Sequence, residues 1–259
     1  MSRTPILLYH SICADPPEWI APYAVRPEIF SAHLDAVIAS GRQPLTISQY
    51  ADRLRGAVGF PSRAVLVTID DGFADFAQNA LPALAHRKIP STLYVTTGAL
   101  ADCRPESVLP SARMLRGADL PGLEAEGVEI GAHSHTHRQM DILPVHEIKR
   151  ELSLSGMLLN ERLGHSIRSF AYPHGYWRRR ILELVKEAGF DSACTVGNSL
   201  SSGTDRMLAL PRLMVTAHTD TLEVAAWLEG SGPPVTSRSY RASAFAWRQY
   251  RRTASMLRQ

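Results

Sequence analysis

The chain has 259 residues, of which 45% are hydrophobic and 20% are charged. This balance provides enough apolar surface for a substantial core and excludes a disordered protein. The formal net charge is +3, but the last 22 residues hold six arginines and no acidic residue, so removing those six charges leaves about −3 for the rest of the chain. We therefore expect no nucleic-acid partner for the body of the protein.

Short apolar runs alternate along the chain with longer segments of helical periodicity. The runs that predict strands cover residues 6–9, 64–69, 92–96, 128–130, 169–172, 193–196 and 210–215. Helical spacing follows Pro27 and Pro144, and a third helix is predicted to end at Gly189, because glycine is common where helices stop. Strands that alternate with helices indicate an α/β fold with a parallel sheet, whose functional residues lie at the carboxyl ends of the strands.

The last part of the chain differs from the body. We expect a single domain over residues 1–230, with its motifs within about 64–216, followed by a linker that begins in "GSGPPVTSRS" and a basic C-terminal tail over 231–259. The tail interleaves arginine with Phe245, Trp247, Tyr250 and Leu257. Such a stretch either lies on an anionic membrane surface as a peripheral contact or forms a solvated helix, and both interpretations stay open.

The start of the chain and its cysteines bear on the compartment. The sequence begins without a signal peptide and contains no run of eighteen apolar residues, so we expect a cytoplasmic protein. Cys13, Cys103 and Cys194 are far apart and form no CxxC pair, which predicts free thiols. The sequence leaves the oligomeric state open.

Two adjacent carboxylates, Asp70 and Asp71, follow the apolar run at 64–69 and precede Gly72. Two ionised carboxylates at a buried strand end are costly unless a cation neutralises them or one is held protonated. The alternative is structural, since Asp-Gly is a common turn. The DxDGT pattern of aspartyl-phosphate phosphatases is excluded, because it needs one residue between the two carboxylates.

Three histidines in five residues follow the predicted strand at 128–130. On a helical turn, His133 and His137 lie on one side and can share a metal ion, while His135 points elsewhere. Two imidazoles and one carboxylate form a common ligand set for a divalent ion that keeps open positions. If Asp71 completes this set, Asp70 is left beside the metal as a general base for a bound water.

Three motifs in this order resemble a known family. "TIDDG" at 68–72, "HSHTH" at 133–137 and "FAYPHG" at 170–175 are similar to the motifs of the polysaccharide deacetylases of carbohydrate esterase family four, which carry the NodB homology domain. The resemblance extends over about four fifths of the chain. It implies a distorted, incomplete (β/α) barrel and an enzyme that removes N-acetyl or O-acetyl groups from sugars.

The resemblance also implies roles for individual residues. Asp70 matches the catalytic base, and Asp71, His133 and His137 match the ligands of a divalent ion, with Zn²⁺ preferred and Co²⁺, Ni²⁺ or Mn²⁺ as alternatives. The third motif supplies a groove wall with Tyr172, Pro173 and Gly175, and the backbone N–H of Tyr172 is expected to form part of an oxyanion hole.

The third and last motifs depart from the commonest pattern of the family. Many members read "RPPYG", whereas Ala171 stands at the arginine position here, in the "AYP" form of the branch that acts on exopolysaccharides such as poly-N-acetylglucosamine. We expect Arg212, rather than Arg168, to supply the missing charge beside Asp70. His218 is the nearest candidate for the histidine that acts as general acid in the family.

Further residues are candidates for contact with the sugar. His10 ends the first predicted strand and is expected to line the site. Trp177 either stacks on a sugar ring or begins the following helix. We therefore expect a metal-dependent deacetylase of an acetylated polysaccharide or amino-sugar glycan. The alternative is a catalytically silent carbohydrate-binding domain of the same fold, recruited to a membrane by its tail.

Overall fold

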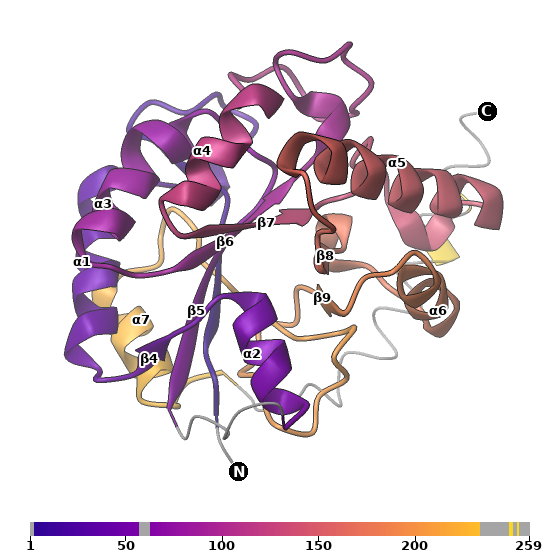
Figure 1. Ribbon diagram of the computed structural model, residues 1–259. Coiled ribbons are helices and arrows are strands. Elements are labelled where there is room, and N and C mark those ends of the chain that lie inside the picture. The colour runs from indigo at the N-terminus through magenta and orange to yellow at the C-terminus, as the bar shows by residue number, and fades with distance from the viewer. Residues whose placement is uncertain (1–2, 57–62, 234–248, 251–252, 254–259) are drawn as a thin grey trace.

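A curled parallel sheet forms the centre of the computed structural model, which describes residues 3–56, 63–233, 249–250 and 253 (Figure 1). The strand order is β10-β1-β5-β6-β7-β8-β9, and β4 pairs with the amino end of β5. All these pairs are parallel. The strands are β1 (Ile6–Tyr9), β4 (Gln43–Pro44), β5 (Ala64–Ile69), β6 (Ser91–Val95), β7 (Val128–Ala132), β8 (Ser169–Ala171), β9 (Ser192–Cys194) and β10 (Leu213–Met214).

The two edges of the curled sheet meet in the segment that contains β10. Leu210 bridges to Cys194 of β9, and Leu213 pairs with Leu7 of β1. Pro211 stands between these two pairings and has no N–H to donate, which explains why the strand predicted at 210–215 is shortened to two residues. The sheet is thus a distorted, incomplete barrel, as the family resemblance implies.

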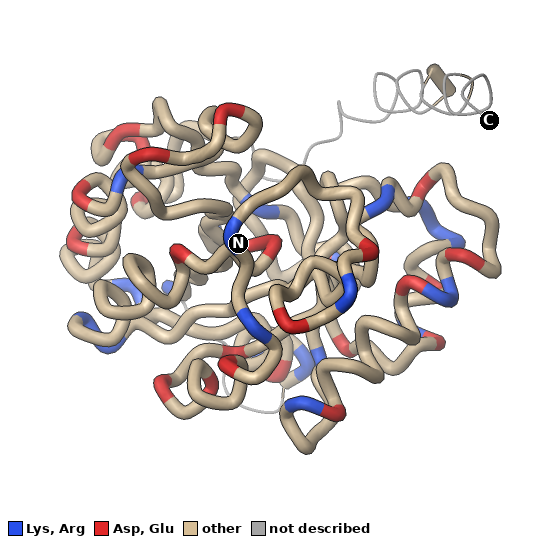
Figure 2. Tube along the Cα trace, turned by 90° about the horizontal axis from the view of Figure 1, so that it is seen from above, with Lys and Arg blue, Asp and Glu red and all other residues tan. Residues whose placement is uncertain are grey.

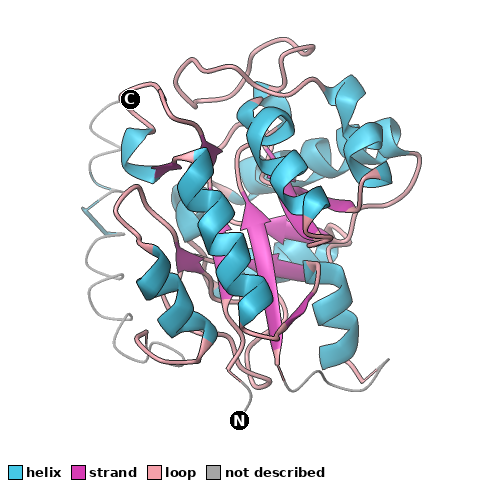
Figure 3. Cartoon of the chain, turned by 90° about the vertical axis from the view of Figure 1, so that its left-hand side faces the viewer, coloured by secondary structure: helices cyan, strands magenta, loops and turns pink. Residues whose placement is uncertain are grey.

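Seven α-helices of the described chain surround the sheet (Figure 3). A proline begins α1, a reciprocal capping pair of Thr46 and Gln49 begins α2, and Gly164 ends α5 with a φ of 75°. The helices are α1 (Pro27–Ala39), α2 (Ile47–Leu54), α3 (Leu81–His86), α4 (Leu120–Ala125), α5 (Val145–Leu163), α6 (Arg179–Glu187) and α7 (Thr221–Leu228).

Short elements connect the strands and helices. A second sheet pairs β2 (Ser11–Ile12) with β3 (Ala24–Val25) after the end of β1. One π-helical segment, η2 (Phe76–Ala80), leads into α3. The 3₁₀ turns are η1 (Ala21–Tyr23), η3 (Thr97–Ala99), η4 (Gly117–Asp119), η5 (Met140–Ile142) and η6 (Pro173–Gly175).

Apolar side chains fill both sides of the sheet. All six residues of β5 are buried, as expected for a parallel strand covered on both faces. The larger cluster lies between the sheet and its helices, and a smaller one includes Ile6, Leu66, Tyr94 and Leu210. The three cysteines are free, as their spacing predicts.

Charged residues are interspersed by sign along the described chain rather than gathered into one basic face (Figure 2). Within the described ranges, no helix is both long and apolar enough to cross a membrane. The basic tail lies mostly outside those ranges, so the expected membrane contact and the boundary between body and tail remain predictions.

Candidate metal centre

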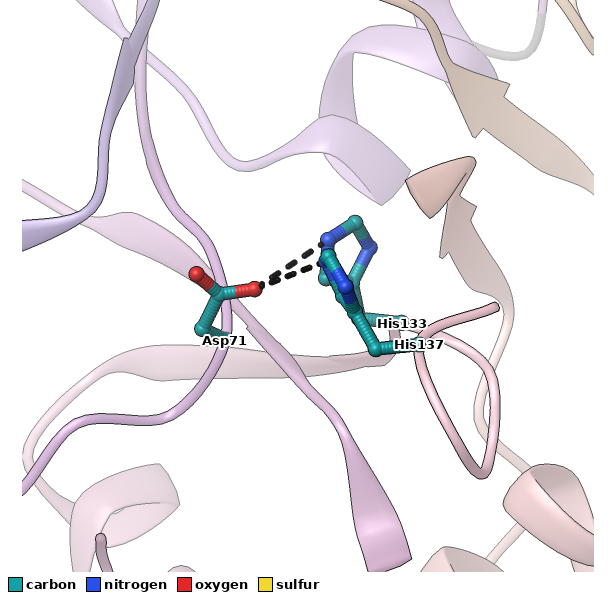
Figure 4. A group of neighbouring side chains, drawn as sticks. All are labelled: Asp71, His133 and His137. Carbon is teal, nitrogen blue, oxygen red and sulfur yellow. Dashed lines mark ion pairs between the residues drawn. The ribbon is translucent and has the colours of Figure 1, made fainter. Parts of the chain in front are cut away.

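The carboxyl ends of neighbouring strands bring the predicted ligands together. Asp70 and Asp71 directly follow β5, His133 directly follows β7, and β6 lies between these two strands. His137 belongs to the loop that continues from His133. In Figure 4 the side chains of Asp71, His133 and His137 point toward one another from these separate segments.

Three buried side chains converge on one point. Asp71 Oδ1 lies 3.5 Å from His133 Nε2 and 3.2 Å from His137 Nε2, and one ligand atom from each residue falls within 4.8 Å of the others. Asp71 Oδ1 is buried and makes no hydrogen bond. A buried carboxylate oxygen without a donor, facing two imidazole nitrogens, fits a divalent cation.

The tautomer of His133 is set by its second nitrogen. His133 Nδ1 lies 2.8 Å from the carbonyl oxygen of Ala171, which can only accept, so Nδ1 carries the proton. The lone pair of Nε2 therefore faces Asp71, as a metal ligand requires. Burial lowers the pKa of His133 to about 4, even though Asp70 and Asp71 favour its charged form. His133 is thus neutral near pH 7.

The backbone around the ligands is strained. In the described chain, four of the six non-glycine residues with positive φ lie in the three motifs: Asp71 at 74°, Ser134 at 60°, His137 at 63° and His174 at 57°. Gly72 continues the turn after Asp71 with a φ of 89°. Each non-glycine residue in this region costs about 1–3 kcal/mol, and such residues gather at functional sites.

Arg212 lies against Asp70 in a two-point ion pair. Its two terminal nitrogens donate to the two carboxylate oxygens at 2.7 Å each, and its side chain is fully buried. The guanidinium also lies over the ring of Tyr94 at 5.4 Å. Burial raises the pKa of Asp70, but Arg212 and then His133 outweigh burial, so the pKa is lowered overall.

Arg168, the alternative partner for Asp70, is used elsewhere. Its guanidinium pairs with Asp52 at 2.5 Å and with Asp191 at 2.8 Å, and its side chain is 41% exposed. Of the two arginines that the sequence offered, the structure therefore places Arg212 beside Asp70.

His10 lies beside the carboxylate pair. Its Nδ1 is buried without a hydrogen bond, and its ring is 5.5 Å from that of Tyr23. Burial lowers the pKa of His10, whereas the charges of Asp71 and Asp70 act in the opposite direction. His10 therefore contributes to the electrostatics of the site.

His218, the predicted general acid, belongs to the loop between β10 and α7. It is exposed, and its backbone N–H donates to Thr216 Oγ1. Together with Tyr23, Val196 and Trp227, it lines an open groove of about 800 Å³ beside β10 and α7. Tyr23, which lines this groove, is also the residue whose ring lies 5.5 Å from that of His10.

The expectation for the N–H of Tyr172 is wrong. This N–H donates to the carbonyl oxygen of Cys194 at 3.0 Å, as part of the pairing between strands, and so does not face an oxyanion. The Tyr172 ring is fully buried and its hydroxyl donates to the carbonyl of Leu208. Pro173 and Gly175 are also buried and form the turn after β8.

The next residues of the third motif are closer to the surface. Trp177 is 38% exposed and precedes α6. His174, which sequence reasoning did not select, has its ring centre 4.8 Å from that of His137 and stacks on Tyr176 at 5.9 Å. Its position between Pro173 and Gly175, which were both expected to line the groove, could have identified His174 as a candidate site residue.

Comparisons with known proteins agree with these motifs. A model of the polysaccharide deacetylase family matches residues 57–193, just over half of the chain. YxkH of Bacillus subtilis (strain 168), whose name places it among the polysaccharide deacetylases, is 22% identical over 228 residues, covering 88% of this chain and 77% of that protein. A poly-beta-1,6-N-acetyl-D-glucosamine N-deacetylase of Staphylococcus aureus (strain MSSA476) is 24% identical over 166 residues, covering 61% of this chain and 56% of that protein.

Solved structures share the fold over most of the chain. The deacetylase PplD of Streptococcus pyogenes aligns with a TM-score of 0.76 at 22% identity, covering 89% of this chain and 99% of that chain. IcaB from Ammonifex degensii aligns with a TM-score of 0.75 at 25% identity, covering 88% and 98%. The family match and the shared curled sheet lead to one conclusion: this chain belongs to the polysaccharide deacetylase family.

Proposed function

We propose that this protein is a metal-dependent deacetylase that hydrolyses the N-acetyl groups of an amino-sugar polysaccharide. The observation that supports this most directly is the unpaired Oδ1 of Asp71, which faces His133 and His137 beside an ionised Asp70. The name of the Staphylococcus aureus relative supports the choice of a poly-N-acetylglucosamine-like substrate, although the match covers only 56% of that protein.

Asp71, His133 and His137 would hold the cation. One carboxylate and two imidazoles suit Zn²⁺, and Co²⁺, Ni²⁺ or Mn²⁺ accept the same donors. When bound, the ion supplies a Lewis acid that activates water and polarises the acetyl carbonyl. The Nδ1 proton of His133, held by the carbonyl of Ala171, keeps that ring turned toward the centre.

Asp70 would take the proton from the attacking water. Arg212 holds both carboxylate oxygens, so Asp70 stays ionised and fixed in orientation despite its burial. The departing amine also needs a proton. His218 is the donor that the sequence suggests, and His10 is a second histidine outside the ligand set, near enough to Asp70 and Asp71 for both charges to affect its pKa.

Acetate release tests this proposal. The protein is incubated with a panel of N-acetylated and O-acetylated oligosaccharides, including a β-1,6-linked N-acetylglucosamine oligomer, before and after removal of metal with a chelator. We expect acetate from the N-acetylated members, loss of release after chelation, and recovery when Zn²⁺ or Co²⁺ is restored. If protein with demonstrated bound metal releases no acetate from any member of the panel, the proposed deacetylase activity is contradicted and the carbohydrate-binding alternative is favoured.

A further inference from the structure

A buried carboxylate on α5 holds the loop that connects the two histidine ligands. Glu151 is 2% exposed. Its Oε2 accepts the backbone N–H of His135 at 3.0 Å and that of Thr136 at 2.7 Å, while its Oε1 accepts the hydroxyl of Thr136 at 2.6 Å. All three donors belong to the turn between His133 and His137.

This turn needs external support because its own conformation is unfavourable. Ser134 and His137 both have positive φ, which side chains other than glycine rarely adopt. Inside the turn, the hydroxyl oxygen of Ser134 accepts the N–H of His137 at 3.0 Å. The N–H groups of the two central residues, His135 and Thr136, are buried and take their acceptor from another element, α5.

The bonds that Glu151 makes distinguish it from a ligand. One oxygen accepts two N–H groups and the other accepts a hydroxyl, and the group of side chains that could hold a metal consists of Asp71, His133 and His137. Hydrogen bonds from N–H groups to an ionised carboxylate are short and strong. Glu151 therefore fixes the backbone of the turn and leaves the imidazoles free to face Asp71.

We infer that Glu151 is a positioning residue of the metal centre: it holds the 133–137 turn in the strained conformation that aims both imidazoles at Asp71. The inference rests on the proposed function, because it concerns a centre that binds a cation. Residues that orient metal ligands from outside commonly change metal affinity by about 10–100-fold when they are replaced.

Zinc affinity of the full-length protein tests the inference. Metal-free wild type, Glu151→Ala and Glu151→Gln are titrated with Zn²⁺ against a chromogenic chelator, and the thermal unfolding of each metal-free protein is recorded. We expect the Kd of Glu151→Ala for zinc to rise about 10–100-fold. Glu151→Gln keeps an oxygen that can accept the two N–H groups, so its Kd should recover most of that loss.

Two further variants keep the test decisive if Glu151→Ala does not fold. Thr136→Val removes only the hydroxyl bond to Oε1, and we expect a several-fold rise in the zinc Kd. Glu161→Ala is the matched control, because Glu161 is an exposed residue of the same helix, and its zinc Kd should equal that of wild type.

The outcomes separate the inference from the proposed function. If wild type binds no zinc, the proposed metal-dependent function fails. If wild type binds zinc and the variants at Glu151 and Thr136 unfold at lower temperature but bind zinc as wild type does, Glu151 only stabilises the fold and the inference is overturned. Visible spectra of the Co²⁺-loaded proteins give a second readout, since a reoriented imidazole changes the cobalt bands.

Discussion

The carboxylates at the two ends of strand β7 differ in their hydrogen bonding. Near the amino end, the Glu129 carboxylate accepts the N–H of Ser48 at 3.0 Å and the hydroxyls of Ser48, Thr92 and Ser169 at 2.7, 3.1 and 2.7 Å. Just beyond the carboxyl end, His133 faces an Asp71 oxygen that is buried and accepts no hydrogen bond.

The difference separates a structural carboxylate from one that can bind a cation. Glu129 ties α2 to β6, β7 and β8, and its hydrogen-bonding capacity is used within the fold. At the other end, the fold buries Asp71 Oδ1 without a hydrogen bond and holds strained backbone at Asp71, Ser134 and His137. Uncompensated burial of this kind is costly, so it indicates a site that is completed by something from outside the chain.

The largest expected effect of a substitution falls on the ligands at the carboxyl end. His133→Ala should lose both metal and turnover, because it removes one of three ligand atoms. Asp70→Asn should keep the metal but lower kcat by about 10²–10⁴, because an amide cannot accept the proton of the attacking water. Metal content by atomic absorption and kcat from acetate release check both variants.

This pair of variants also tests the division of roles between the two aspartates. Asp71→Asn serves as the matched comparison, and it should behave like His133→Ala rather than like Asp70→Asn. If Asp70→Asn loses the metal while Asp71→Asn retains it, the assignment of ligand and base is reversed.

The sequence predicted much of the fold and of the site because its motifs follow strands. The apolar runs predicted β1 and β5 with the bounds that the structure has. Parallel strands bring the residues that follow them to the same edge of the sheet. That reasoning placed Asp70, Asp71 and His133 together without any coordinates. Arg212 was expected instead from the resemblance, which implies a cation beside Asp70, and it lies directly before β10 rather than after a strand.

Other features depend on contacts that sequence spacing does not encode. Glu151 acts from a helix on backbone N–H groups, and nothing in a periodic helical pattern marks one glutamate as an acceptor for a distant turn. The error at Tyr172 had a different cause. The residue was predicted to end a strand, and the N–H of such a residue still pairs with the neighbouring strand, here with Cys194.

Arg212→Met should have the next largest effect. The variant leaves the Asp70 carboxylate buried without its cation, and breaking such a pair typically costs about 3–5 kcal/mol of unfolding free energy. Arg212 opposes the rise in pKa that burial causes at Asp70. Without it the carboxyl protonates at higher pH, so the acidic limb of kcat/KM should move to higher pH. Chemical denaturation and a pH–rate profile measure the two effects.

Arg168→Met is the matched control for that prediction. It removes an arginine that pairs with Asp52 and Asp191 on the surface. This is the arginine that the sequence offered as the alternative partner of Asp70. Exposed pairs contribute about 0–1 kcal/mol, so its stability should change little and its pH profile not at all. If the acidic limb of kcat/KM shifts in Arg168→Met and stays fixed in Arg212→Met, the ion pair between Arg212 and Asp70 does not set the pKa of Asp70.

The smallest effect on activity is expected from Glu129→Gln, at the other end of β7. The amide keeps one oxygen acceptor but cannot accept all the donors of Ser48, Thr92 and Ser169, so we expect a loss of about 1–3 kcal/mol of unfolding free energy. Because the strand ends that hold the ligands stay in place, zinc Kd and kcat per folded molecule should match wild type. Denaturant unfolding combined with zinc titration measures both quantities. A zinc affinity that falls together with stability would mean that the two ends of the barrel are coupled, and the contrast between a structural end and a cation-binding end would not hold.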